Sequence, residues 1–444
     1  MPDAFFIRNA TIINEGLSVQ GSLFVSGGVI RRIYPAALSP DIPAGAMVID
    51  ATGQWLLPGV IDTHVHFREP GATHKACIAS ETRAAAAGGV TSFIDMPNNM
   101  PATTTLELLE EKCRHAATTS LLNYSFYLGA TNDNLEEIKR IKPAEVGGVK
   151  LFLGSSTGNM LVDNETTIAA IFAEAPVLTA VHSEDDMLVR RNLNALVARH
   201  SGALQAGDHP RIRTAEACLR STERVMKLAS KYRAAVHILH VTTAGECALF
   251  QPGAAITAEA CIPHLWFDGA AYAHWQNFVK CNPAIKTAAD REALRRAVTN
   301  GCITTVATDH APHTRSEKQQ PYLQAPSGMP SVQYSLPLML ELCREKIFTP
   351  EMVVERMCHA PARLFKIARR GFIREGYYAD LTLVHPDREW RITDATVLSK
   401  CGWTPYAGTT VHTQVTHTFI NGTPVFMNGA INDAAKGQRL LFTA

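Results

Sequence analysis

Two histidines separated by one residue are the first candidates for chemistry in this sequence. They lie in Asp62-Thr63-His64-Val65-His66, directly after an apolar run. If the run is a β-strand, both imidazoles face the same side, because alternate residues of a strand do so. Two such imidazoles can bind one metal ion, at about 2.0–2.1 Å for zinc. Paired histidines also occur as hydrogen-bonded core residues, so the assignment depends on the other strands.

Three further apolar runs end in residue types that bind metals. They end at His182, at His240 and at Asp309. His237 has the opposite strand parity to His240 and is predicted to be structural, while His310 alternates away from Asp309 and is predicted to pack behind the site. The runs therefore bring histidines and an aspartate to one rim, as a metal site requires.

A lysine interrupts another apolar run, Val149-Lys150-Leu151-Phe152. It could be a buried lysine paired with an acid. Because an ammonium would be repelled by two divalent cations, Lys150 fits the site better as an anionic carbamate, formed with CO2, that bridges two metal ions. A bridged pair would generate hydroxide at neutral pH and polarise an amide carbonyl. Asp309 could then carry the proton to the leaving nitrogen, although it could also be a strand-end cap.

The elements that must position these residues follow a βα rhythm. We predict strands at about 58–64, 90–95, 122–128, 147–152, 177–182, 236–241, 254–259 and 303–309, with helical stretches such as Glu81–Ala87, Leu106–Ala116 and Glu216–Tyr232 between them. Eight strands predict an α/β fold of the (β/α)8 TIM-barrel type, which places functional groups at the C-terminal strand ends. An open doubly wound sheet is the alternative, but no GxGxxG follows an early strand. We assign residues 58–365 to the barrel.

Both ends of the chain instead show the alternation of antiparallel strands, including a turn at Asn421-Gly422. We therefore predict that residues 1–57 and 366–444 form one composite small β-sandwich domain.

Composition and charge exclude several classes of protein. The chain has 444 residues with 46% hydrophobic and 19% charged residues, which is typical of a folded globular protein. A net charge of +1 gives no general attraction to nucleic acid or to an anionic membrane. The ten cysteines form no CxxC pair, and an acid, Asp3, stands where a signal peptide would be basic. No apolar run approaches about 18 residues. We expect a cytoplasmic protein with no nucleic-acid or membrane partner.

Three longer motifs resemble those of dihydroorotases, the cyclic amidases of pyrimidine biosynthesis within the amidohydrolase superfamily. The motifs are Leu57 to Gly71 (LPGVIDTHVHFREPG), Ala87 to Thr91 (AGGVT) with Met96-Pro97-Asn98, and Ala307 to His313 (ATDHAPH). The resemblance implies two zinc ions per subunit, bridged by N6-carboxylated Lys150. It assigns His64, His66, Lys150 and Asp309 to one zinc, and Lys150, His182 and His240 to the other. It also makes Asp309 the catalytic acid/base.

The guanidinium of Arg68, two residues beyond His66, has the fork geometry that suits a carboxylate. The resemblance assigns the substrate carboxylate to Arg68, Asn98 and His313, and ring contacts to Asn282, Ser327 and Gly328. It implies reversible hydrolysis of (S)-dihydroorotate to N-carbamoyl-L-aspartate by a zinc-bridging hydroxide. We also expect a homo-oligomer, most simply a dimer.

Two related enzymes share the fold and metal chemistry but act on neutral rings. Hydantoinases or dihydropyrimidinases usually lack an arginine after the histidine pair, and allantoinases typically carry a different residue at the position of Arg68. An inactive paralogue that serves only as a partner protein is disfavoured, because all the expected metal ligands are present.

Overall fold

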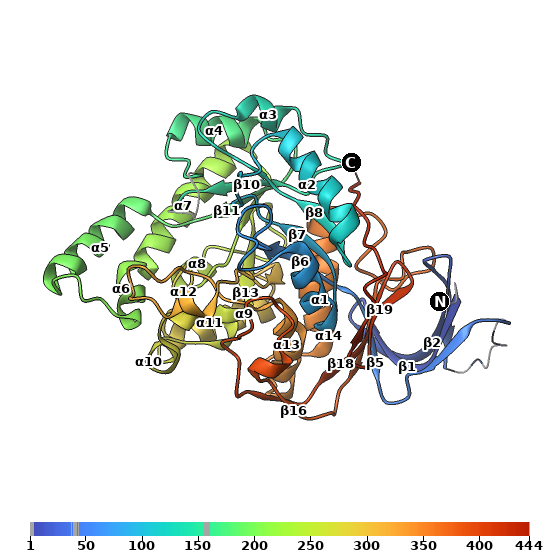
Figure 1. Cartoon of the computed structure of the whole chain (residues 1–444). Helices are drawn as coiled ribbons and strands as arrows, with labels where there is room; N and C mark the ends of the chain where they lie inside the picture. Colours follow the sequence, from blue (N-terminus) through green and yellow to red (C-terminus); the bar gives the residue numbers. More distant parts are fainter. Residues whose placement is uncertain (1–3, 37, 39–41, 43, 155–159, 444) are drawn as a thin grey trace.

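The centre of the molecule is a closed barrel of parallel strands (Figure 1). The computed structural model describes residues 4–443 except 37, 39–41, 43 and 155–159, so Asp3 lies outside the described residues. The barrel strands are β6 (Val60–Val65), β7 (Val90–Asp95), β8 (Asn123–Phe126) with its continuation β9 (Leu128–Gly129), β10 (Val149–Phe152), β11 (Thr179–His182), β12 (Val236–Ile238), β13 (Thr257–Cys261) and β14 (Thr305–Ala307). A parallel bridge between Val65 and His310 joins the last strand to the first. The predicted (β/α)8 barrel is confirmed.

Helices surround the strands and are mostly started by side-chain caps. The α-helices are α1 (Ile78–Ala87), α2 (Leu106–Thr119), α3 (Leu135–Lys139), α4 (Glu165–Glu174), α5 (Asp186–Arg199), α6 (His209–Ile212), α7 (Ala215–Tyr232), α8 (Ala244–Cys247), α9 (Ile262–Trp266), α10 (Ala271–Trp275), α11 (Ala288–Thr299), α12 (Arg315–Lys318), α13 (Ser335–Arg344), α14 (Pro350–Val354) and α15 (Ala360–Leu364). The N-caps Thr105, Thr214 and Thr287 each accept a backbone N–H of the first turn. In the described part of the chain, no helix has the length and apolar character needed to cross a membrane.

The two ends of the chain share one sheet beside the barrel (Figure 1). Its strands, in spatial order, are β20 (Ala430–Ile431), β19 (Thr423–Met427), β18 (Gln414–Ile420), β15 (Leu381–His385), β5 (Trp55–Pro58), β1 (Ala4–Asn14), β2 (Leu17–Ser26) and β3 (Val29–Pro35), and β4 (Met47–Asp50) also pairs with β1. The rings of Phe5 and Phe419 are 5.7 Å apart although two strands separate theirs, so the sheet curls over its own apolar core. The composite β-sandwich is confirmed, and Asn421-Gly422 forms the β18–β19 turn with positive φ at both residues.

Two segments of the C-terminal part return to the barrel. Residues 437–442 lie along β8, where the Tyr124 N–H donates to Gln438 and the Leu440 N–H donates to Tyr124. The segment with the short strands β16 (Trp390–Arg391) and β17 (Thr410–Val411) also brings in Trp403, whose indole donates to the carbonyl of His313 at 2.7 Å. Part of residues 366–444 therefore supports the barrel face on which the site lies. The domain boundaries at residues 57 and 366 stay a prediction.

Candidate metal centre and substrate cavity

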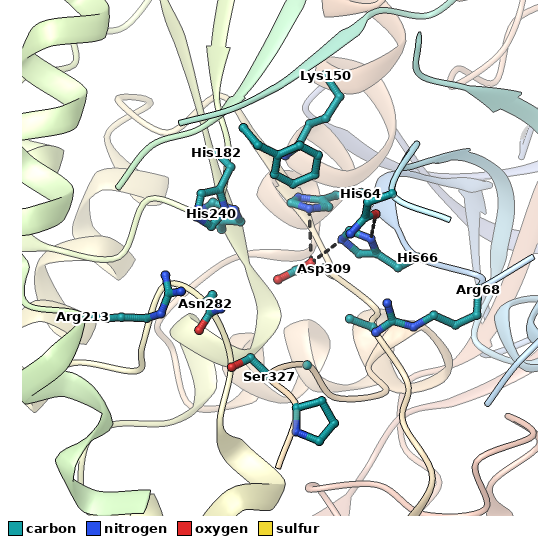
Figure 2. Close-up of a pocket in the computed structure, with 15 residues that line it drawn as sticks. His64, His66, Arg68, Lys150, His182, Arg213, His240, Asn282, Asp309 and Ser327 are labelled. Carbon is teal, nitrogen blue, oxygen red and sulfur yellow. Dashed lines mark hydrogen bonds and ion pairs between the residues drawn. The ribbon is translucent and has the colours of Figure 1, made fainter. Parts of the chain in front are cut away.

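A cavity of about 270 Å³ opens at the C-terminal ends of the barrel strands (Figure 2). The predicted site residues that line it are His64, His66, Arg68, Asn98, Lys150, His182, His240, Asn282, Asp309, Ser327 and Gly328. His313 is the exception, because it is buried behind Arg68. Residues up to 264 positions apart in the chain thus meet at one place, which is the arrangement that the strand ends predict.

The first group of candidate ligands is His64, His66 and Asp309. Oδ1 of Asp309 lies 3.2 Å from Nε2 of His64 and 3.1 Å from Nε2 of His66. The other ring nitrogens are occupied, since Nδ1 of His64 lies 2.7 Å from Glu259 and Nδ1 of His66 donates to Oδ1 of Asn98 at 2.7 Å. The Nε2 lone pairs are therefore left for a cation. The spacing is close to the ~3.3 Å edge of a tetrahedron with zinc–nitrogen bonds of ~2.0–2.1 Å.

The charges around this group also favour a bound cation. Burial opposes a charge on His64, but Glu259 and Asp309 outweigh it and raise the pKa of His64 to about 9. Burial likewise disfavours the carboxylate of Asp309, yet His64 and His66 hold its pKa well below the usual value. Two carboxylates around one imidazole thus favour positive charge at the point where the three side chains meet. The donor set fits a divalent metal ion.

The second group of candidate ligands is His182 and His240. Nδ1 of His182 lies 2.9 Å from Nε2 of His240, while Nε2 of His182 donates to Glu184 at 2.9 Å. Nδ1 of His240 is buried and has no hydrogen-bond partner among the described residues. Burial lowers the pKa of both histidines and keeps them neutral, which is the form that binds metal. The unsatisfied nitrogen and the neutral pair fit a second metal position.

Lys150 enters the cavity from β10, above His64 in Figure 2. Its side chain is fully buried and Nζ lies 4.6 Å from the ring centre of Phe152, with no ion pair to any residue of the described chain. Burial lowers the pKa of Lys150 to about 7, against the attraction of Asp309 and Glu259. The alternative of a lysine paired with an acid is therefore not what the structure contains.

Three residues of the site have strained backbones. Arg68 (φ 66°), His240 (φ 40°) and Asp309 (φ 48°) all adopt left-handed conformations directly after barrel strands. For residues other than glycine this conformation costs about 1–2 kcal/mol each. Such strain persists where the surrounding structure fixes it, and it gathers at functional sites. Here it turns each side chain into the cavity from the end of its strand.

Arg68 is the cation on one wall of the cavity, and its guanidinium packs against His313. Nε of Arg68 donates to the carbonyl of Pro312 at 2.9 Å, and its Nη2 lies 3.0 Å from Nε2 of His313. Nζ of Lys75 lies 3.0 Å from the other ring nitrogen of His313. Burial, together with Arg68, Lys75 and Lys318, holds the pKa of His313 well below its usual value, so this imidazole adds no positive charge beside Arg68.

The loop at the open side of the cavity, residues 321–328, is held by two buried lysines. Lys280 donates to the carbonyls of Tyr322 and Ala325 at 2.7 and 2.6 Å. Lys318 donates to the carbonyls of Pro326 and Gly328 at 2.9 and 2.8 Å and to that of Lys280 at 3.1 Å. The two buried amines thus hold four carbonyls of the loop, which fixes it before substrate arrives.

The prediction that His237 and His310 are structural is confirmed. The two ring nitrogens of His237 contact Thr257 and Thr305 at 2.7 and 3.1 Å, on the barrel floor. His310 contacts the buried Glu81 at 2.8 Å, away from the cavity.

Three charged residues of the site were not predicted from the sequence. Glu259, on β13, contacts His64, and Glu184 contacts both His182 and Arg213, which lines the cavity. A carboxylate within an apolar strand, as at Glu259, is the same pattern that drew attention to Lys150. Arg213 carries no such pattern, because it follows a helix outside the regular barrel.

Comparisons with known proteins agree with this geometry. Residues 55–425 match the model of the amidohydrolase family. A dihydroorotase of Halobacterium salinarum is 36% identical over 376 residues, 82% of this chain and 85% of the relative. An allantoinase of Streptomyces avermitilis is 30% identical over 443 residues, 98% of each chain. The structure of an L-hydantoinase (dihydropyrimidinase) from Arthrobacter aurescens matches with a TM-score of 0.91 at 23% identity, over 99% of this chain and 100% of that one. The chain therefore belongs to the amidohydrolase family.

Proposed function

We propose that this protein is a cyclic amide hydrolase of the dihydroorotase type, which interconverts (S)-dihydroorotate and N-carbamoyl-L-aspartate. The observation that carries the proposal is Arg68, a buried cation in the cavity wall that makes no ion pair with any described residue. A buried charge without a partner is costly, so the partner of Arg68 is expected to be an anionic group of the substrate. Dihydroorotate carries a ring carboxylate, whereas hydantoin, dihydrouracil and allantoin are neutral.

The side chains of the cavity have different roles in the proposed reaction. Arg68 binds the ring carboxylate, and Asn98, whose Oδ1 accepts from His66, lines the same cavity. Asp309 takes the proton of the attacking water and passes it to the ring nitrogen as the amide bond breaks. Against the effect of burial, the neighbouring His64 and His66 lower the pKa of Asp309, so it is ionised before the reaction.

We propose that two zinc ions bind here, one at His64, His66 and Asp309 and one at His182 and His240, with carboxylated Lys150 shared between them. When bound, such ions supply a nucleophilic water at neutral pH and polarise the scissile carbonyl. The full burial of Lys150 and its lack of an ion pair with any described residue support the modification. Metal analysis tests this assignment, because replacing Lys150 by Met should reduce the bound metal from two ions to one or none.

The proposed substrate is tested by turnover of dihydroorotate, hydantoin, dihydrouracil and allantoin, with and without prior chelation. We expect chelator-sensitive activity on dihydroorotate alone. Arg68→Met should raise the KM for dihydroorotate about 10- to 100-fold, through loss of a charge-assisted contact of about 1.5–3 kcal/mol, while Arg68→Lys should lose less. Turnover of allantoin instead of dihydroorotate would replace the proposal with the allantoinase activity that the full-length relative's name suggests.

A further inference from the structure

A second arginine lines the cavity on the side opposite Arg68 (Figure 2). It is Arg213, which directly follows the short helix α6 and is 7% exposed. We propose that Arg213 binds the urea carbonyl of the substrate ring; this inference rests on the proposed function and names a substrate contact that the sequence motifs do not assign.

The position of Arg213 is fixed by a buried carboxylate. Its Nη1 donates to Oε2 of Glu184, and the same carboxylate oxygen accepts from Nε2 of His182. Glu184 is the only hydrogen-bond partner of the Arg213 guanidinium among the described residues. A guanidinium has five N–H donors, so most of them remain for a ligand in the cavity.

A neighbouring amide adds to this donor wall. Asn282 lines the cavity beside Arg213, and its Oδ1 accepts from Nε2 of His209 at 3.1 Å (Figure 2). With its oxygen engaged in this way, the NH2 of Asn282 remains as a donor. Arg213 and Asn282 together therefore favour an acceptor on the ligand, such as a carbonyl oxygen.

The shape of a six-membered ureide ring matches three walls of the cavity. Suppose that the scissile carbonyl of the ring faces Asp309 and its histidines. One ring nitrogen then lies directly across the ring, with the urea carbonyl on one side of it and the carboxylate-bearing carbon on the other. The urea oxygen and the carboxylate therefore point to opposite sides of the cavity. Arg68 and Arg213 likewise lie on opposite sides of Asp309 (Figure 2). Since Arg68 binds the carboxylate in the proposed function, the urea oxygen lies next to Arg213.

The competing explanation is that Arg213 only neutralises Glu184 and thereby orients His182. The two explanations differ for a substrate whose urea oxygen is replaced. Sulfur accepts hydrogen bonds poorly, so 2-thiodihydroorotate should gain little from Arg213 in the wild-type enzyme. Loss of a purely structural role would instead harm both substrates equally.

The test compares kcat/KM for dihydroorotate and its 2-thio analogue in metal-loaded wild type and Arg213→Met. We expect a fall of about 10- to 100-fold for dihydroorotate, as for loss of a hydrogen bond from a charged donor, and of less than about 3-fold for the thio analogue. Glu184→Gln keeps a side-chain oxygen that accepts from Arg213 and removes only the charge, so it is the matched control and should lower both values by the same factor. Equal falls in Arg213→Met, or no fall, would overturn the proposal.

Two provisions keep the result interpretable. If Arg213→Met loses metal or folds poorly, the double variant Glu184→Gln/Arg213→Met removes both buried charges. The ratio of kcat/KM for dihydroorotate to kcat/KM for the thio analogue is then compared between the double variant and Glu184→Gln. If the wild type proves to hydrolyse a neutral ring, the proposed function fails, but hydantoin and 2-thiohydantoin carry the same urea group. The same selectivity loss on that pair would support Arg213 independently.

Discussion

Replacing Glu259 by Gln should weaken one metal position and spare the other. The carboxylate of Glu259 is completely buried, and its Oε1 lies 2.7 Å from Nδ1 of His64 and accepts the His240 backbone N–H at 3.3 Å. It therefore fixes the ring of His64 with Nε2 toward Asp309. Glutamine keeps the volume and an acceptor but loses the charge. Groups that orient metal ligands in this way are worth 10- to 100-fold in metal affinity, or about 1.4–2.8 kcal/mol.

The assay is competition with a chromophoric chelator, followed by metal analysis after each step of release. Glu184→Gln is the matched control, because Glu184 contacts His182 at 2.9 Å and so supports the other position. We expect Glu259→Gln to lower the affinity of one ion and Glu184→Gln that of the other. The reasoning is refuted if Glu259→Gln binds both ions as the wild type does, or if the two variants weaken the same ion.

Three further predictions concern the surroundings of the site. Lys318→Met removes the donor to the loop carbonyls of Pro326 and Gly328 and to the carbonyl of Lys280 (2.8–3.1 Å). The variant should raise KM by about 10-fold with less effect on kcat. An unchanged KM in steady-state kinetics would contradict this prediction. Burial raises the pKa of Glu317, but hydrogen bonds from the backbone N–H of Thr314 and from Lys75 lower it to about 2. The contribution of Glu317 to the free energy of unfolding is therefore complete above about pH 4.3, and it is lost as the pH falls toward 2. The difference in Tm between wild type and Glu317→Gln should therefore be larger at pH 6 than at pH 3, and a constant difference would argue against this role. Gly437→Ala would place a Cβ 1.7 Å from the carbonyl oxygen of Leu122, so the C-terminal segment must shift and the free energy of unfolding should fall by about 1–3 kcal/mol, as measured by denaturant titration.

The barrel could be predicted because its evidence is local. A buried parallel strand such as β7 or β10 is an almost continuous apolar run between turn residues, and each run is visible without knowledge of its neighbours. The same locality explains why the candidate metal ligands could be predicted. His64, His182 and Asp309 each follow such a run, and the fold class alone brings strand ends together.

The residues that support the ligands could not be predicted in the same way. Glu259 and His64 are 195 positions apart, and their 2.7 Å contact depends on the register of strands on different parts of the barrel. Arg213 reaches the cavity only because the excursion of α5 and α6 after β11 folds back over the strand ends, which no periodicity indicates. His313 is buried against Arg68 and does not line the cavity, so its assignment to the substrate carboxylate, which comes from the resemblance, stays a prediction.

The residues proposed for catalysis and those proposed for substrate selection lie in different parts of this chain. The candidate ligands stand at the ends of barrel strands, where hydrogen bonds between strands and buried carboxylates fix them. The groups proposed to choose the substrate instead come from the segments that follow the strands: Arg68 after β6, Arg213 after α6, and the loop at residues 321–328 after β14. Changes in these segments should therefore alter the preferred ring while the strand-end ligands stay in place. Arg68, whose side-chain hydrogen bonds go to Pro312 and His313, is the position at which selectivity among cyclic amides is expected to change while metal content stays constant.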